Sequence, residues 1–199
     1  MPVTRRGLRL VTAAIVGPIL VVLAVVNWSR LQATVNTATS GGDTTIEVPT
    51  NAMSPTIQKG DSLAVSTEEP FQLQVGDVVT TPLPGEAASG GTTLKRIIAI
   101  GPADVTIADG RVLVDGKAID EPYLEPGTMT EAPSRAILAC EPALPCHVPE
   151  GSFWGMGDNR RESADSRIFG PLPLDQVDGV VLAIVAPSNR TGEIAGSPE

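Results

Sequence analysis

The longest apolar stretch of the chain lies near its N-terminus, at residues 10–28. It contains 19 residues without a charge, and a helix rising about 1.5 Å per residue would extend roughly 28 Å over it, enough to cross the hydrocarbon core of a bilayer. We therefore expect residues 10–28 to form a transmembrane signal anchor. A cleaved secretory signal is the alternative, because Arg5 and Arg6 also make a suitable positively charged start. The length of the run favours the retained anchor.

The charges that flank this run set its expected orientation. Three arginines precede it and one follows it, while all 23 acidic residues lie beyond position 30. By the positive-inside rule, residues 1–9 should be cytoplasmic and the main domain should be extracytoplasmic, held in the cell membrane by a single span. Residues 29–45 are mostly small and polar, and we expect them to form a tether.

Beyond residue 45 the pattern changes to short apolar runs separated by turn residues. The runs are rich in Val and Ile and bounded by Gly, Pro and Asp, as strands are. Two Asp-Gly pairs, Asp109-Gly110 and Asp115-Gly116, are strong signals for two-residue hairpins. We expect a mainly β domain over residues 46–187 and a flexible tail over 188–199. The expected strands are Ser62–Ser66, 77–81, 94–100, 105–107, 112–114 and 180–186.

Composition agrees with a β domain and argues against one class of partner. Aromatic residues make up 3% of the chain, and there are 20 Gly and 18 Pro, which suits short strands joined by turns better than a helix bundle. Beyond residue 30 the chain carries ten basic and 23 acidic residues, a formal charge of −13. Such a surface repels nucleic acid, so we expect no DNA or RNA partner.

Two cysteines, Cys140 and Cys146, lie six residues apart in a proline-rich stretch. In an oxidising compartment they can close a small loop by a disulfide, and two free thiols are the alternative. A metal site would need further ligands, and the only histidine of the chain, His147, is adjacent to Cys146. We expect a disulfide and no metal.

Lys95 is the residue that composition alone would not predict. It lies in a strand-like run beside Leu94, Ile97 and Ile98, where burial would lower the pKa of its amine. A neutral lysine near a hydroxyl is a competent general base, and serine–lysine pairs are a known variant of the catalytic triad. The alternative is a lysine at a strand end that extends its amine into water.

Several segments taken together resemble, in order, the conserved boxes of type I signal peptidases. Residues 52–57 read Ala-Met-Ser-Pro-Thr-Ile, where that family has Ser-Met-x-Pro-Thr-Leu. Residues 76–79 read Gly-Asp-Val-Val, and residues 95–99 match the family's lysine box. The box Gly-Asp-Asn-x-x-x-Ser-x-Asp-Ser-Arg is complete at residues 157–167. The family's usual Pro-Gly-Asp is replaced by Gly-Pro-Ala-Asp at residues 101–104.

The resemblance implies roles for individual residues. Lys95 would be the general base, and Ser163 would hydrogen-bond to its amine and orient it. The Thr50 hydroxyl and the backbone N–H at position 52 would form an oxyanion hole, in which one donor is typically worth about 3 kcal/mol. The implied fold is a signal-peptidase-like β-sheet or barrel domain with one N-terminal transmembrane helix.

The resemblance also implies a set of supporting residues. Shallow apolar pockets would accept alanine-sized groups, which gives a preference for Ala-x-Ala sites, and two ion pairs would stabilise the loops around the site. The pockets would be lined by Val48, Met53, Ile57 and Leu94, and the ion pairs would be Asp158 with Arg96 and Asp165 with Arg167.

Position 52 departs from the family, because Ala52 stands where the nucleophilic serine belongs. Three interpretations remain open. Ala52 is a replacement in an otherwise active member, or the chain is a natural homologue that binds without cleaving, or Ser54 or Thr50 acts as a substitute nucleophile. In an extended segment residues i and i+2 share a face, but a shift of two residues displaces the hydroxyl by about 6.6 Å, more than reactive geometry tolerates. We therefore favour the substitute nucleophile least.

The sequence thus predicts a monomeric, single-pass signal peptidase I-like serine endopeptidase. Its expected partners are the lipid bilayer and the signal peptides of exported preproteins, which it would remove after Ala-x-Ala sites without a metal or organic cofactor. The alternative is a membrane-anchored, catalytically inactive homologue that binds signal peptides or a partner. A self-cleaving repressor-type serine–lysine peptidase is disfavoured by the anchor and by the lack of a DNA-binding region.

Overall fold

The computed structural model describes residues 43–82, 92–132 and 145–196. All of them belong to the second of the two units into which the chain divides, residues 42–199. The expected cytoplasmic start, the signal anchor and most of the tether lie outside the described residues. Within the three described ranges, no helix is both long enough and apolar enough to span a bilayer.

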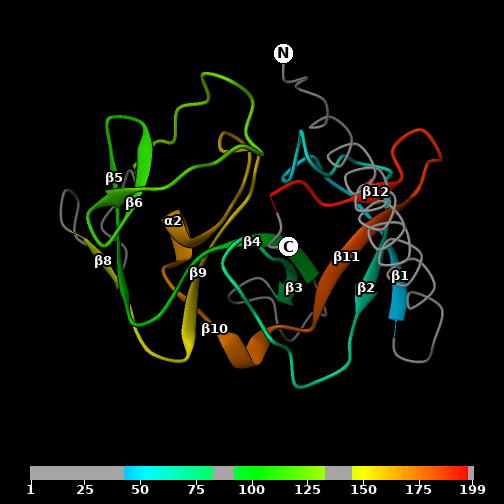
Figure 1. Cartoon of the computed structure of the whole chain (residues 1–199), viewed down its shortest axis with the longest axis horizontal. Helices are drawn as coiled ribbons and strands as arrows, with labels where there is room; N and C mark the ends of the chain where they lie inside the picture. The colour runs from blue at the N-terminus through cyan, green and yellow to red at the C-terminus, as the bar shows by residue number, and fades with distance from the viewer. Residues whose placement is uncertain (1–42, 83–91, 133–144, 197–199) are drawn as a thin grey trace, which may run out of the picture. The chain divides into compact units, whose positions relative to one another are not determined.

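The larger of two sheets contains most of the predicted strands (Figure 1). β12 pairs with β11 beside the main path of this sheet. The order along that path is β1 (Asp43–Glu47), β2 (Ser62–Ser66), β11 (Gly179–Ala186), β3 (Val78–Pro82), β4 (Thr92–Ile100), β9 (Ser152–Met156) and β10 (Leu172–Pro173), and β12 is Gly192–Glu193.

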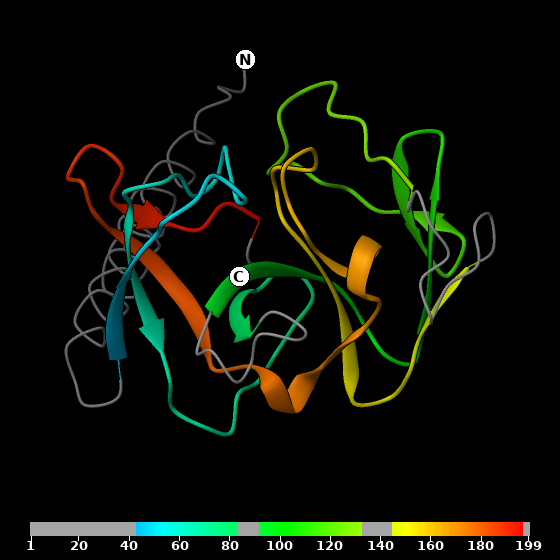
Figure 2. The ribbon, with the colours of Figure 1, turned by 180° about the vertical axis from the view of Figure 1, so that it is seen from behind.

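The smaller sheet has the order β7 (Lys117–Ala118), β6 (Arg111–Val114), β5 (Ala103–Ala108) and β8 (Cys146–Val148). Its two hairpins turn at the two Asp-Gly pairs, as the sequence predicts. Asp109 and Asp115 both have φ of 50°, and the glycine after each has φ of 73° and 75°. Positive φ at both central residues is the requirement of a type I′ turn, which Asp-Gly meets with little strain. Figure 2 shows this sheet from behind.

Six strands were expected, and all six are present, with ends that differ from the expected ones by at most two residues. The mainly β fold is therefore confirmed, whereas β9 was not predicted. Its sequence is Ser-Phe-Trp-Gly-Met, and Phe153, Trp154 and Met156 are all fully buried. A short strand buried on both faces lacks the alternation that identifies half-buried strands.

The core contains three clusters of buried side chains, of which only the one around Trp154 combines residues of both sheets. One lies around Trp154 and Val112, a second around Met53 and Ile57, and a third around Phe153. β9 contributes to two of the three clusters, because Trp154 and Phe153 point to opposite faces of the strand. This strand therefore ties the centre of the larger sheet to two separate parts of the core.

The expectation of a flexible tail from residue 188 is wrong for the described part of that segment. β12 pairs with β11, and Ile194 is 4% exposed in the cluster around Met53 and Ile57. The Arg190 guanidinium binds the Asp61 carboxylate through Nε at 2.8 Å and Nη2 at 3.0 Å. No periodic pattern marks this segment, because a two-residue strand and one buried isoleucine are too few to form one. The tether also ends earlier than expected, since β1 starts at Asp43.

We expect Ile194→Ala to lower the free energy of unfolding by about 2–4 kcal/mol, because truncating a buried isoleucine removes apolar contacts and leaves a cavity. Urea denaturation of the full chain measures this. Val185→Ala is the matched control, since Val185 on the adjacent strand is 42% exposed. Equal stability of the two variants would contradict the docked C-terminal segment.

Candidate functional site

Lys95 lies in the middle of β4, between β3 and β9. It is 2% exposed, so its amine is inside the protein and does not extend into water. Nζ donates to Thr93 Oγ1 at 2.7 Å and to the Leu94 carbonyl oxygen at 2.9 Å. The buried position predicted for this lysine is therefore present, but its hydrogen-bond partners are not those the sequence led us to expect.

Burial lowers the pKa of Lys95 from 10.5 to about 8, and the nearby Asp165 carboxylate opposes part of that shift. Removing water disfavours the ammonium, because the charged form loses more solvation than the neutral form. A substantial fraction of the amine is therefore neutral at mildly alkaline pH. A neutral amine inside the protein can accept a proton from a neighbouring hydroxyl.

Two other residues, Ala52 and Ser163, meet at Gly157, which the strand register places across from Lys95. The register of β4 with β9 pairs Arg96 with Met156, which places Lys95 opposite Gly157 and on the same face. A side chain on Gly157 would collide with Ser163 Oγ and with the carbonyl oxygen of Ala52. Ala52 and Ser163 therefore approach the site only because residue 157 has no Cβ.

Asn159 attaches the segment containing Ala52 to this corner. Its backbone N–H donates to the Ala52 carbonyl oxygen at 3.0 Å, and its Nδ2 donates to the Asn51 carbonyl oxygen at 3.1 Å. Sequence analysis did not assign Asn159 this role. The two bonds connect positions more than 100 residues apart, and no local pattern predicts such a contact.

Ser163 does not hydrogen-bond to Lys95 in this structure. Its side chain is buried, and Oγ finds no partner among the described residues. A buried hydroxyl without a partner is uncommon in folded proteins. The expected hydrogen bond between Ser163 and Lys95 is thus not formed here, and Thr93 Oγ1 accepts from the amine instead.

The two groups expected to form an oxyanion hole, the Thr50 hydroxyl and the Ala52 N–H, lie close to each other. The Ala52 N–H donates to Thr50 Oγ1 in a long contact of 3.5 Å. Thr50 is exposed and Ala52 is partly exposed, so a ligand can reach them.

The assumption that residues 50–54 are extended is wrong. Residues 51–57 form turns, closed by hydrogen bonds from Ser54 N to Asn51 O and from Ile57 N to Met53 O. In a turn, residues i and i+2 no longer share a face. Ser54 lines a separate pocket of roughly 360 Å³ together with Asn159 and Arg161. This geometry argues against Ser54 as a substitute nucleophile.

The four residues expected to line apolar pockets gather in one cluster. Val48, Met53 and Ile57 are 2%, 1% and 0% exposed, and Leu94 packs against them partly buried. In this structure they therefore form core and not an open surface. The turn that follows Ala52 buries Met53 and Ile57 on its inner side, which a reading of the motif alone does not reveal.

Both ion pairs expected from the sequence are formed. Arg96 and Asp158 are 0% and 1% exposed in their side chains and are bridged by two hydrogen bonds of 2.9 and 2.8 Å. Asp165 accepts from Arg167 Nε and Nη2, both at 2.8 Å. Asp165 also caps α2 (Ser166–Phe169) through the Arg167 backbone N–H and accepts from Gly157 N at 3.1 Å. These bonds fix the loop that carries Ser163.

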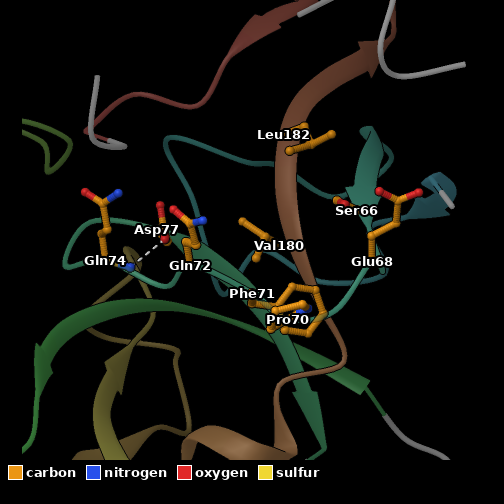
Figure 3. Close-up of a pocket in the computed structure, with 9 residues that line it drawn as sticks. All are labelled: Ser66, Glu68, Pro70, Phe71, Gln72, Gln74, Asp77, Val180 and Leu182. Carbon is orange, nitrogen blue, oxygen red and sulfur yellow. Dashed lines mark hydrogen bonds between the residues drawn. The ribbon is translucent and has the colours of Figure 1, made fainter. Parts of the chain in front are cut away.

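A second hollow of roughly 370 Å³ lies between β11 and the segment that leads into β3 (Figure 3). Phe71, Val180 and Leu182 line its apolar side, and Glu68 and Asp77 its polar side. Burial raises the pKa of Asp77, opposed by a hydrogen bond from the Gln74 backbone N–H and by the charge of Arg96. Lys95, Ala52 and Ser163 take no part in this hollow, which is separate from the site at Gly157.

Cys146 is disulfide-bonded, and Cys140, the only other cysteine of the chain, lies outside the described residues. Next to it on β8, His147 Nδ1 lies 3.0 Å from an Asp104 oxygen at the surface. Across the described ranges, no three His, Cys, Asp or Glu side chains are grouped closely enough to hold a metal ion.

Comparisons with known proteins place the chain in a family. Residues 13–186 match the family described as signal peptidase, peptidase S26. A probable signal peptidase I-1 of Synechocystis is 32% identical over 154 residues, which covers 74% of this chain and 73% of that protein. Signal peptidase I of Mycobacterium tuberculosis is 38% identical over 113 residues, 51% of this chain but 38% of that protein.

Among solved structures, a signal peptidase I from Enterococcus faecalis is 25% identical, with a TM-score of 0.41 over 55% of this chain and 97% of that one. The family assignment rests on two of these matches. The family matches most of the chain, and the Synechocystis relative is similar over most of its own length. The chain belongs to the signal peptidase family, peptidase S26, and its relatives are type I signal peptidases.

Proposed function

We propose that this chain is a membrane-anchored homologue of signal peptidase I with a serine–lysine site that is complete except for its nucleophilic hydroxyl. The main domain is extracytoplasmic and monomeric, and the ligands are signal peptides with Ala-x-Ala sites. One observation carries the proposal: Lys95 is buried with a lowered pKa, and the strand register places it opposite Gly157, against which the Ala52 backbone packs. The membrane anchor in this proposal rests on the sequence of residues 10–28 alone.

The proposed reaction requires a hydroxyl at position 52. Its oxygen attacks the carbonyl carbon of the scissile bond while its proton passes to the neutral amine of Lys95. The oxyanion that forms accepts hydrogen bonds from Thr50 Oγ1 and from the N–H of residue 52. Lys95 then gives the proton to the leaving amine, and water hydrolyses the ester by the same route in reverse. Ala52 removes the first step and leaves the other groups in place.

Signal-peptide binding without cleavage is the second candidate function, and Ala52 is the observation that favours it. Neither the proposed oxyanion donors nor the loop fixed by Asp165 and Arg167 requires the missing hydroxyl, so binding of the peptide need not depend on it. Fluorescence polarisation of a labelled Ala-x-Ala peptide with the native full-length chain measures this. Saturable binding that a bulky residue in place of either alanine abolishes would support it, and no binding would contradict it.

We expect cleavage by the Ala52→Ser variant to rise with pH through about 8, the pKa of Lys95. Below that pH the neutral fraction of the base increases about tenfold per unit, and above it the rate levels. The contribution of Lys95 to the free energy of unfolding also rises with pH. Between pH 8 and 10.5, roughly, the folded chain binds fewer protons at Lys95 than the unfolded chain does, so stability increases with pH in that window. A profile of kcat/KM that is flat from pH 6 to 9 would contradict Lys95 as the base.

A further inference from the structure

Thr93 is the strongest unassigned group near the site. It lies two residues before Lys95 on β4, so both side chains project from the same face of the strand. The bond between Thr93 Oγ1 and Lys95 Nζ is 2.7 Å, shorter than the 2.9 Å bond to the Leu94 carbonyl. Neither the motif comparison nor the ion pairs give this residue a role.

The two hydrogen bonds from the amine orient the lone pair of neutral Lys95. A neutral lysine amine has two N–H groups and one lone pair, whereas the ammonium has three N–H groups and no lone pair. Thr93 Oγ1 and the Leu94 carbonyl oxygen are two acceptors. They use both N–H groups of the neutral form and leave its lone pair in the remaining direction of the tetrahedral nitrogen.

The surroundings of Lys95 leave few other ways to orient the amine. The side chain is 2% exposed, so solvent cannot hold it. Ser163 Oγ makes no hydrogen bond within the described part of the chain. Asp165 acts on Lys95 by charge, but its oxygens already accept from Arg167 and from Gly157 N.

We propose that Thr93 is a positioning residue for Lys95, whose hydroxyl, with the Leu94 carbonyl, holds the amine so that its lone pair meets a hydroxyl at position 52. This inference rests on the proposed function. Thr93 itself does not touch the substrate. During the reaction the proton from that hydroxyl forms the third N–H of Lys95, and the bonds to Thr93 and Leu94 remain.

A matched control lies on the neighbouring strand, directly opposite Thr93. Thr81 on β3 pairs with Thr93 on the same face. Thr81 is 1% exposed, and its hydroxyl has no hydrogen-bond partner among the described residues. Thr81→Val and Thr93→Val therefore make the same chemical change at neighbouring positions, and only the second removes a bond to Lys95.

The test is steady-state cleavage of an Ala-x-Ala peptide by the full-length Ala52→Ser variant, with each threonine change added. We expect Thr93→Val to lower kcat about 10- to 100-fold with little change in KM, because it weakens a general base worth about 10²- to 10⁴-fold. Thr93→Ser should retain activity within about threefold, and Thr81→Val should behave like the parent. Equal activity of Thr93→Val and Thr81→Val would overturn the inference while leaving the proposed function standing.

A second readout is independent of catalysis. The chain has three lysines, Lys59, Lys95 and Lys117, so an NMR titration of lysine ¹³Cε in the native full-length chain can be assigned with Lys95→Met. Removing an acceptor that stabilises the ammonium should move the pKa of Lys95 further down in Thr93→Val but not in Thr81→Val. An unchanged pKa in Thr93→Val would contradict the bond. If the Ala52→Ser variant is silent while this shift is seen, the proposed peptidase reaction fails and the Thr93 contact stands.

Discussion

The Ala52→Ser substitution is expected to turn a chain with no measurable peptidase activity into one that cleaves an Ala-x-Ala peptide. Removing the nucleophile of a serine peptidase lowers turnover by about 10⁶-fold, so restoring it should raise kcat by up to that factor. The gain requires that the neutral amine of Lys95 and the Thr50 hydroxyl are already in place beside position 52. Product formation, followed by liquid chromatography for the native chain and the variant, measures it.

Three controls give this prediction its meaning. Ala52→Ser combined with Lys95→Met should be silent, because the variant hydroxyl then has no base. Ala52→Thr supplies a hydroxyl with an extra methyl group and should recover less activity, since the corner around Gly157 is crowded. Activity of the native chain that Ser54→Ala abolishes would contradict the account, because it would make Ser54 the nucleophile.

Asp158→Ala is expected to lower the free energy of unfolding by about 3–5 kcal/mol. The substitution leaves the Arg96 guanidinium with 0% exposure and without its carboxylate partner. Arg96 would keep a hydrogen bond to the Gly76 carbonyl oxygen at 2.8 Å and its position 4.1 Å above the Tyr123 ring. Neither contact neutralises a buried charge. Urea denaturation measures the loss.

The surface pair of Asp104 and His147 is the matched control for this loss. Their side chains are 54% and 67% exposed, and exposed ion pairs are typically worth less than about 1 kcal/mol. Asp104→Ala should therefore change stability by less than that amount. Comparable losses of stability in the two variants would contradict the view that the Arg96–Asp158 pair contributes more to the free energy of unfolding because it is buried.

Sequence reasoning succeeded where the signal is local. The Asp-Gly turns and the Val- and Ile-rich strands follow from backbone preferences within a few residues. The apolar neighbours of Lys95 left both a buried and an exposed amine open, and the structure has the buried one. The family match confirmed the resemblance that the motifs suggested.

Sequence reasoning failed where the result depends on distant segments. Arg190 is part of the fold because it reaches the Asp61 carboxylate more than 100 residues away. Ile194 is part of it because it joins a cluster most of whose members lie more than 100 residues earlier in the chain. The bonds of Asn159 to the Ala52 segment have the same origin. Such contacts form only when the strands pair and bring distant segments together. No periodic pattern in the sequence around these residues indicates them.

The motif predicted Ser163 as the hydrogen-bond partner of Lys95, whereas the structure has Thr93 in that position. A motif names a residue type at a position, whereas the partner of a buried amine depends on which acceptors lie within reach of it. Thr93 could have been noticed from its spacing, since residues two apart on a strand share a face. Spacing alone would not have distinguished it from an exposed threonine near a strand end.

The most direct test of the central claim is intact-mass analysis of acid-quenched mixtures of the chain with an Ala-x-Ala peptide. The claim is that every group of the site except the hydroxyl at position 52 is in place. It predicts an acyl adduct of the N-terminal peptide fragment on the Ala52→Ser variant, mapped by digestion to position 52, and no adduct on the native chain. An adduct on Ser54 or Thr50 of the native chain, or no adduct on a variant that cleaves the peptide, would contradict it.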